Sequence, residues 1–478
     1  SGDSNFNVGI GTTNPTATPG AGSTSILAVG ILSAYQLYGD GSNLSGLAGF
    51  SPDADENLVA GTSAGANLDG SNACFNIFLG CNAGKVVTSG NTNIGLGKNA
   101  LGTGTVTGCE NIAIGHGAGT DMTSGCANVL MGYGSAKNLT TGKCNVVLGY
   151  DSYSNQTSGD NNVIIGKEAN TGGTGSDSVF IGRYAGPGTS AGSNIGYNIG
   201  LGYNSGGASN AADYKYNIAL GHNAHLGGSY ACYNVALGYD TMRCMCNGEA
   251  NIAMGQAALH GSGTASDNTG SYNIALGRNA GKAVTTATGA IYIGRSAGCS
   301  NAGGEYAIII GQSAGVTGTA ICDNIIIGRE AGNAGSLTGK YNVVLGMQAG
   351  CDIAAGEYNT LLGHCAGTNL TSGDSNVMLG HGAGQSGAMA GNDNVFIGKY
   401  AGKSADEVNY NIIIGTCAGC STVCGTSCQG DTNIYIGYNA AKTATTGFEN
   451  IVIGDRAVSA GAMTGYRNII MGWEAGCL

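Results

Sequence analysis

One pattern of apolar and polar positions repeats along the chain from Asn57 to Asn468. Each copy reads Asn, three apolar residues, Gly, two variable residues, Ala and Gly, as in Asn111-Ile112-Ala113-Ile114-Gly115-His116-Gly117-Ala118-Gly119. We count 24 copies, mostly 17 or 18 residues apart, with Gly at the fifth position of all 24, Asn at the first of 21 and Ala at the eighth of 20. So regular a register indicates a repeat protein.

The period of the repeat selects the fold class. A helical repeat needs roughly 33 residues or more because two packed helices form its unit, whereas about 17 residues fit one turn of a β-solenoid. The sequence therefore predicts an all-β protein, a parallel β-solenoid of 24 turns, taken as a left-handed β-roll. The inter-strand spacing gives it a length on the order of 110 Å. We expect residues 57–478 to form this domain and residues 1–56 to form a capping or attachment segment with short strands.

Alternation within each apolar run predicts which side chains face inward. Positions two and four share one face of a strand. They are regular, with Ile or Val common at position two and Leu, Ile or Met at position four, as in Ile325 and Ile327. We therefore expect these two positions to form the inner column of the solenoid. Position three then points outward, although it is apolar in most copies.

An apolar outer column along the whole chain indicates a partner surface. For a repetitive chain the simplest partner is another copy, associated side by side. The predicted interface consists of position-three residues: Phe78, Ile164, Phe180, Gly200, Ala219, Ala236, Ala253, Ala275, Ile326 and Phe396. Small residues follow one another from Gly200 to Ala275, so we expect the associated chains to approach most closely over residues 198–277.

Composition and charge exclude several functions. Only 10% of the 478 residues are charged, and the formal net charge of −11 offers no basic surface for nucleic acid. No apolar run approaches the roughly 20 residues of a membrane helix, so we expect no membrane insertion. The N-terminus has no signal-peptide pattern.

Two stretches near the N-terminus carry a family resemblance. Asn7-Val8-Gly9-Ile10-Gly11-Thr12-Thr13-Asn14-Pro15 and Gly39-Asp40-Gly41-Ser42-Asn43-Leu44-Ser45-Gly46 resemble the modules that open tail-fibre and other structural proteins of marine bacteriophages, especially cyanophages. The repeats look like the arrays that follow in those proteins, and like the left-handed β-roll heads of trimeric autotransporter adhesins. The resemblance implies a homotrimeric fibre on a virion or cell surface, in contact with other virion proteins.

The histidines do not form a recurrent catalytic pattern. Four of the six occupy the position after the invariant Gly, where other copies carry Lys, Arg, Tyr or Gln: His116, His222, His364 and His381. No His has a Ser, Cys or Asp partner at a spacing that builds a nucleophile, and no Glu pair recurs as in a glycosidase. We expect no catalytic residue, no cofactor and no metal. The alternative is a metal held by His364 and His381 on successive turns.

The 17 cysteines are an odd number, so at least one lies outside any intrachain pairing. Cys109 and Cys126 occupy the same slot of adjacent turns, which places their Cα atoms within the range of a disulfide. They are the candidate disulfide pair, with packed, reduced thiols as the alternative. Zinc is an alternative for one cluster of sulfurs at short spacing: Cys417, Cys420, Cys424 and Cys428.

Five tyrosines share the variable position after the invariant Gly with Lys, Arg, His and Gln, a mixture suited to stacking on sugars and bonding their hydroxyls. These candidate glycan contacts are Tyr133, Tyr150, Tyr203, Tyr239 and Tyr438. The function we expect is a structural fibre protein of a phage virion that extends from the particle and contacts host surface glycans. The alternatives are a carbohydrate-binding or glycan-cleaving spike, and a subunit of an extracellular filament or bacterial adhesin that stacks end to end through an uncapped C-terminal rung.

Overall fold

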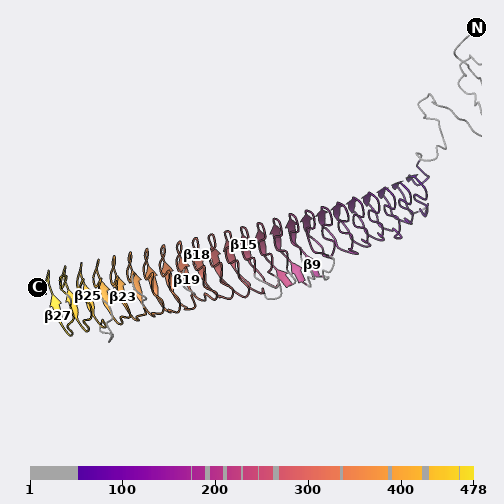
Figure 1. Cartoon of the computed structure of the whole chain (residues 1–478). Helices are drawn as coiled ribbons and strands as arrows, with labels where there is room; N and C mark the ends of the chain where they lie inside the picture. The colour runs from indigo at the N-terminus through magenta and orange to yellow at the C-terminus, as the bar shows by residue number, and fades with distance from the viewer. Residues whose placement is uncertain are drawn as a thin grey trace, which may run out of the picture. The chain divides into compact units, whose positions relative to one another are not determined.

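The computed structural model in Figure 1 describes residues 52–478 apart from 71, 174, 189–193, 208–212, 228–229, 246, 262–267, 334–336, 386–389, 422–429, 462 and 478. Almost all of the predicted capping segment, residues 1–56, lies outside the described residues, and so do Cys424 and Cys428. Residues 52–478 form one compact unit.

The described residues form short strands joined by turns and contain no helix. A 24-stranded sheet consists of β1 (Leu58–Ala60), β2 (Ile77–Leu79), β3 (Ile94–Leu96), β4 (Ile112–Ile114), β5 (Val129–Met131), β6 (Val146–Leu148), β7 (Val163–Ile165), β8 (Val179–Ile181), β10 (Ile199–Leu201), β12 (Ile218–Leu220), β14 (Val235–Leu237), β15 (Ile252–Met254), β16 (Ile274–Leu276), β17 (Ile291–Ile293), β18 (Ile308–Ile310), β19 (Ile325–Ile327), β20 (Val343–Leu345), β21 (Thr360–Leu362), β22 (Val377–Leu379), β23 (Val395–Ile397), β24 (Ile412–Ile414), β25 (Ile434–Ile436), β26 (Ile451–Ile453) and β27 (Ile469–Met471). A second, three-stranded sheet consists of β9 (Asn194–Gly196), β11 (Asp213–Lys215) and β13 (Tyr230–Cys232).

Each strand of the large sheet is the apolar run of one repeat copy, and each pairs in parallel with the strand of the next copy. Pairing is without shift, so that Ile325, Ile326 and Ile327 of β19 lie opposite Val343, Val344 and Leu345 of β20. The turns therefore stack as a row of coils with strands in line (Figure 1). We call one strand with its turns a rung. The predicted fold class, an all-β parallel β-solenoid, is confirmed. The described part of the chain has no helix that could cross a membrane.

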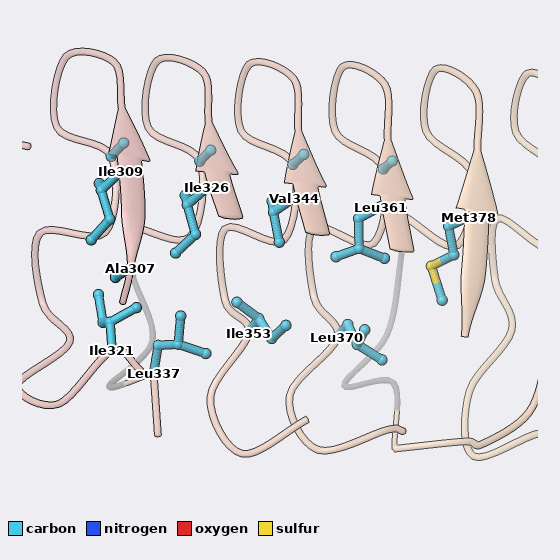
Figure 2. Packing of buried hydrophobic residues seen from close by; sticks show 14 of the residues in the cluster. Ala307, Ile309, Ile321, Ile326, Leu337, Val344, Ile353, Leu361, Leu370 and Met378 are labelled. Carbon is cyan, nitrogen blue, oxygen red and sulfur yellow. The ribbon is translucent and has the colours of Figure 1, made fainter. Parts of the chain in front are cut away.

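The core lies between position three of the strands and the returning loop of each rung. Figure 2 shows Ile309, Ile326 and Val344 on the strands facing Ile321 and Leu337 from the loops. All five side chains are fully buried. The Ala at position eight is also buried in most rungs, as at Ala331 and Ala349. In the rungs of Figure 2, one bulky residue from the strand and one from the loop thus fill the interior.

The predicted orientation of the strands is wrong. Position three is buried, and positions two and four are half-buried or exposed, as Ile325, Ile326 and Ile327 show in β19. The predicted interface residues lie inside the chain, at 0–1% exposure where values are given: Phe78, Ile164, Phe180, Ala219, Ala236, Ala253, Ala275, Ile326 and Phe396, with Gly200 also buried. These residues cannot contact a second copy without unfolding of the rung.

The physical reason is visible in the sizes of neighbouring position-three residues. Phe78 is followed on the next rung by Gly95, where an added Cβ would lie 2.9 Å from the Phe78 ring. Phe180 is followed by Gly200, where the corresponding distance is 2.7 Å. At these two places a Gly makes room for the aromatic ring of the neighbouring rung, which is typical of a packed interior. The regular Ile, Val and Leu of positions two and four are the outer face instead.

The predicted close approach of chains over residues 198–277 is wrong for the same reason. Its small residues face the interior, where Tyr214 of β11 and His225 are also fully buried. The Tyr214 hydroxyl and His225 Nδ1 are 3.0 Å apart. The small position-three residues leave space for these inner side chains rather than for another backbone.

The Asn at position one stabilises the stack from inside. Asn111 is fully buried, and its Nδ2 donates to Asn93 Oδ1 at 3.0 Å and to the Gly125 carbonyl oxygen at 2.8 Å. Its Oδ1 accepts the backbone N–H of Asn128 at 3.1 Å. The same bonds recur along the stack, so each Asn links three rungs and satisfies backbone groups that the three-residue strands leave unpaired.

The invariant Gly at position five is required by conformation and by space. Gly328 has a φ of 142°, which side-chain-bearing residues rarely adopt. An added Cβ there would overlap the carbonyl oxygen of Gly346 on the next rung. Both constraints exclude a side chain at this position, which explains why all 24 copies carry Gly there.

Candidate functional site

The outer face of the large sheet is the most extensive apolar feature of the described chain. Positions two and four of its 24 strands provide 48 side chains, of which 46 are Ile, Val, Leu or Met. Many remain considerably exposed, as shown by Ile252 at 40% and Met254 at 44%. We call these two columns the outer strip. Monomeric soluble proteins rarely expose contiguous apolar patches larger than a few hundred Å², so the strip is the candidate interaction surface.

The sequence folds this way because every rung meets the same constraints. Position three and the buried Asn at position one alternate with positions two and four, so once the first pair faces inward the second must face outward. Sequence reasoning placed the pairs the other way round. The Asn at position one was the missed signal of the inward face, because the hydrogen bonds of its side-chain amide stabilise most where water is excluded.

Two columns of side chains border the outer strip. The leading edge is the residue just before the repeat Asn, which adopts a left-handed conformation in most rungs, for example φ 58° at Tyr197. The trailing edge is the residue just after the invariant Gly. Side chains at both edges are mostly exposed. No leading-edge residue was predicted to be functional, although Tyr precedes the repeat Asn in seven copies.

Aromatic rings stack along both edges at the spacing of the rungs. On the leading edge, Tyr197, Tyr216 and Tyr233 have ring centroids 4.9 Å apart and rings within 7° of parallel. On the trailing edge of the same rungs, His222 stacks between Tyr203 at 4.9 Å and Tyr239 at 5.1 Å. The strip therefore has aromatic borders on both sides at β10, β12 and β14.

The five tyrosines predicted to contact glycans all lie on the trailing edge and are exposed by 41–50%: Tyr133, Tyr150, Tyr203, Tyr239 and Tyr438. Their ring faces are less available than the sequence indicated. Tyr133 is stacked between His116 and Tyr150, each 5.0 Å away, so both of its faces are covered. Their hydroxyls and ring edges remain open to a ligand. Glycan contact stays a prediction.

Two hollows border the trailing edge. One of about 330 Å³ is lined by Asn99, His116, Thr120, Tyr133, Lys137, Tyr150 and Asp151. Another of about 390 Å³ is lined by residues including Glu168, Tyr184, Pro187, Asn204 and Leu226. Both are open and carry a mixture of charge, hydroxyl and amide groups. Among the described residues no three His, Cys, Asp or Glu side chains gather closely enough to hold a metal ion.

One titratable pair lies inside the stack. His225 is fully buried, and burial lowers its pKa from 6.5 to about 4. Burial also raises the pKa of Tyr214 far above its usual value of 10. His225 is therefore neutral near pH 7, and its Nε2 has no hydrogen-bond partner in the structure. The pair contributes to the interior and is closed to substrates.

Cys109 and Cys126 are neighbours, as the sequence predicted, with sulfur atoms 3.5 Å apart as two thiols. The hydrogen bond that the Cys109 thiol donates to the Cys126 sulfur, together with burial, raises the pKa of Cys109. Whether the pair oxidises to a disulfide stays a prediction. Of the proposed zinc cluster, only Cys417 and Cys420 lie in the described part of the chain.

Comparison with known protein families and with curated proteins finds no match to this chain.

Proposed function

We propose that this chain is a structural fibre protein of a bacteriophage virion and that copies of it associate side by side, three to a fibre, through the outer strip. The observation that carries the proposal is the unbroken apolar face of the 24-stranded sheet. The repeat's resemblance to phage fibre arrays supports the virion surface as its location. A fibre needs a long, stiff spacer, and rungs that each pair only with their neighbours provide one.

The size of the strip supports a large partner. A stable interface takes about 20–30 residues from each side, whereas the strip offers two from each of 24 strands. Its columns repeat at the inter-strand spacing of about 4.8 Å. A second copy has the same spacing, so side chains of two strips can interlock along their whole length. A globular partner would match the strip over a few rungs only.

Sedimentation velocity tests the association. We expect the parent chain to sediment as an oligomer and the triple variant Leu345→Asp, Leu362→Asp, Leu379→Asp to sediment more slowly with an unchanged circular dichroism spectrum. These three residues project outward, so charge there should prevent association without unfolding the rungs. Equal sedimentation of the two chains would contradict the proposal.

Electron microscopy tests the virion assignment. Antibodies raised against residues 57–478 should decorate fibres on phage particles from cultures that express this chain. Decoration of the host cell surface with bare particles would favour the alternative of a cellular filament or adhesin.

Glycan binding is a second candidate function, favoured by the hollow beside Tyr133. It combines the Tyr133 and Tyr150 rings with Lys137 and Asp151, groups that can bond sugar hydroxyls. On a glycan array, the parent should bind a subset of oligosaccharides, and Lys137→Ala with Asp151→Ala should lose that binding. Lys85→Ala, a surface substitution outside the hollow, is the control.

A further inference from the structure

Charges at the two edges of the outer strip are sorted by sign. The leading edge carries six acidic residues and one Arg, whereas the trailing edge carries seven Lys or Arg and one Asp. The basic edge stands out because the chain as a whole has 29 acidic and 18 basic residues. Random decoration of a surface would not separate the signs across a strip two side chains wide.

Opposite charges also fall on the same rung. The pairs are Asp177 with Arg183, Asp323 with Arg329, and Asp393 with Lys399, while Glu110 shares its rung with His116 and Glu449 shares its rung with Asp455. The partners cannot meet within one chain, because the three strand residues between them alone span roughly 10 Å. None of the ion pairs among the described residues joins the two edges. The opposite charges of the two edges therefore complement the edges of a second molecule.

The orientation of that second molecule follows from geometry. When copies associate around an axis along the stack and all point the same way, the leading edge of one lies beside the trailing edge of the next. In an antiparallel pair, leading edge meets leading edge, and acid meets acid. We propose that copies of this chain associate through the outer strip in parallel, with the two oppositely charged edges selecting that orientation. This inference rests on the proposed self-association.

The parallel arrangement also pairs charges rung by rung. With rungs aligned, four leading-edge acids face Lys, Arg or His of the neighbouring copy, and Glu449 faces Asp455. A shift by one rung in one direction leaves three acids facing Lys or His and Arg467 facing Asp455, whereas the opposite shift leaves no such pair. At β10, β12 and β14 the aligned arrangement places the Tyr column of the leading edge against the Tyr-His-Tyr column of the trailing edge. Like-charge contacts between two acidic leading edges disfavour the antiparallel orientation.

Exchange of the two edges tests the orientation. In the flipped chain, three rungs carry reversed pairs: Asp177→Arg with Arg183→Asp, Asp323→Arg with Arg329→Asp, and Asp393→Lys with Lys399→Asp. In a parallel assembly the flipped chain pairs with itself as well as the parent does, within about threefold in dissociation constant, because each new edge meets its new complement. Flipped and parent chains should not mix, because acid then meets acid and base meets base.

The two chains are co-expressed with different tags and purified through one tag, and the amount of the other chain is measured. The parallel arrangement predicts recovery at least about tenfold below random mixing. Preferential mixing would show the antiparallel arrangement, and random mixing would show that the edges do not select orientation. Either result overturns the proposal. A parent chain that stays monomeric at every concentration contradicts the proposed self-association itself.

A control reverses the leading edge only, through Asp177→Arg, Asp323→Arg and Asp393→Arg. Every interface then brings base against base, and we expect the dissociation constant to rise at least about tenfold. An unchanged dissociation constant would overturn the proposal.

Discussion

The two faces of the large sheet differ in how they tolerate variation. On the inner face, position three ranges from Gly95 to Tyr292, and neighbours compensate for size. On the outer face, nearly every residue is a branched or unbranched aliphatic side chain of similar volume. In a closed interior a larger side chain on one rung can be offset by a smaller one on the next, because only their summed volume must fit. A face that meets another repetitive surface must present the same shape on every rung.

Charge placed on either face of β19 should give the largest contrast. Ile326→Asp buries an unpaired carboxylate and should unfold the surrounding rungs, a loss of several kcal/mol, on the order of 5. Ile327→Asp projects outward, and the monomer should fold as before while association weakens. Hydrogen exchange of β18 to β20 measures the first effect and sedimentation the second. The faces would be misassigned if the two variants exchanged these outcomes.

The fold class was predictable because the period, the invariant Gly and the short apolar runs are local properties of the sequence. The facing of the strand could not be predicted from its own residues, because Ile325, Ile326 and Ile327 are chemically identical. The loops supply the bulky residues that close over position three, Ile321 before β19 and Leu337 before β20, and their spacing to the strand varies from rung to rung. The size alternation of Phe78 and Gly95 was a readable sign of the interior.

The candidate site was predictable only in part. Trailing-edge tyrosines were correctly placed on the surface, since their slot accepts any polar or aromatic residue. Their ring faces were not predictable, because stacking depends on which residues occupy the same slot one rung away, as for His116 and Tyr133. An exposed apolar column was expected at position three, whereas the structure places it at positions two and four. Whether this column meets a partner stays a prediction.

The next largest contrast is expected between the invariant Gly of a turn and the exposed residue that follows it. Gly328→Val forces a β-branched residue into φ 142° and against the Gly346 carbonyl oxygen. We expect a loss of about 3 kcal/mol or more from the local stability. Arg329→Ala, the neighbouring exposed position, should leave stability unchanged. Denaturant unfolding monitored at β19 and β20 measures both, and equal tolerance would remove the steric role of this Gly.

Low pH should destabilise the rungs around the buried His225. Its pKa is about 4 in the folded chain, against about 6.5 when exposed. Because the folded pKa is depressed, the contribution is present above pH 6.5 and is lost as the pH falls towards 4. The loss between pH 7 and pH 5 should be about 2 kcal/mol, seen as faster hydrogen exchange of β10, β12 and β14. His225→Met should remove this pH dependence, whereas the outer control His222→Gln should keep it.

Changing the sizes of two neighbouring position-three side chains together should give the smallest change in stability. Gly95→Ala places a methyl group against the Phe78 ring, and Phe78→Leu leaves a cavity, so each change alone should be destabilising. Together they should compensate, with a coupling free energy of about 1 kcal/mol in a double-mutant cycle. Additive losses would show that the two rungs do not share one packed volume.

Oxidation of native methionines tests the central claim most directly. Met131 and Met254 lie at position four of the outer strip, 41% and 44% exposed, whereas Met378 at position three is fully buried. Peroxide should oxidise Met131 and Met254 readily in dilute, dissociated protein and slowly in concentrated, associated protein, with Met378 slow in both. Mass spectrometry of the digested chain gives all three rates. Rapid oxidation of Met131 and Met254 in the fully associated protein would contradict burial of the outer strip between copies.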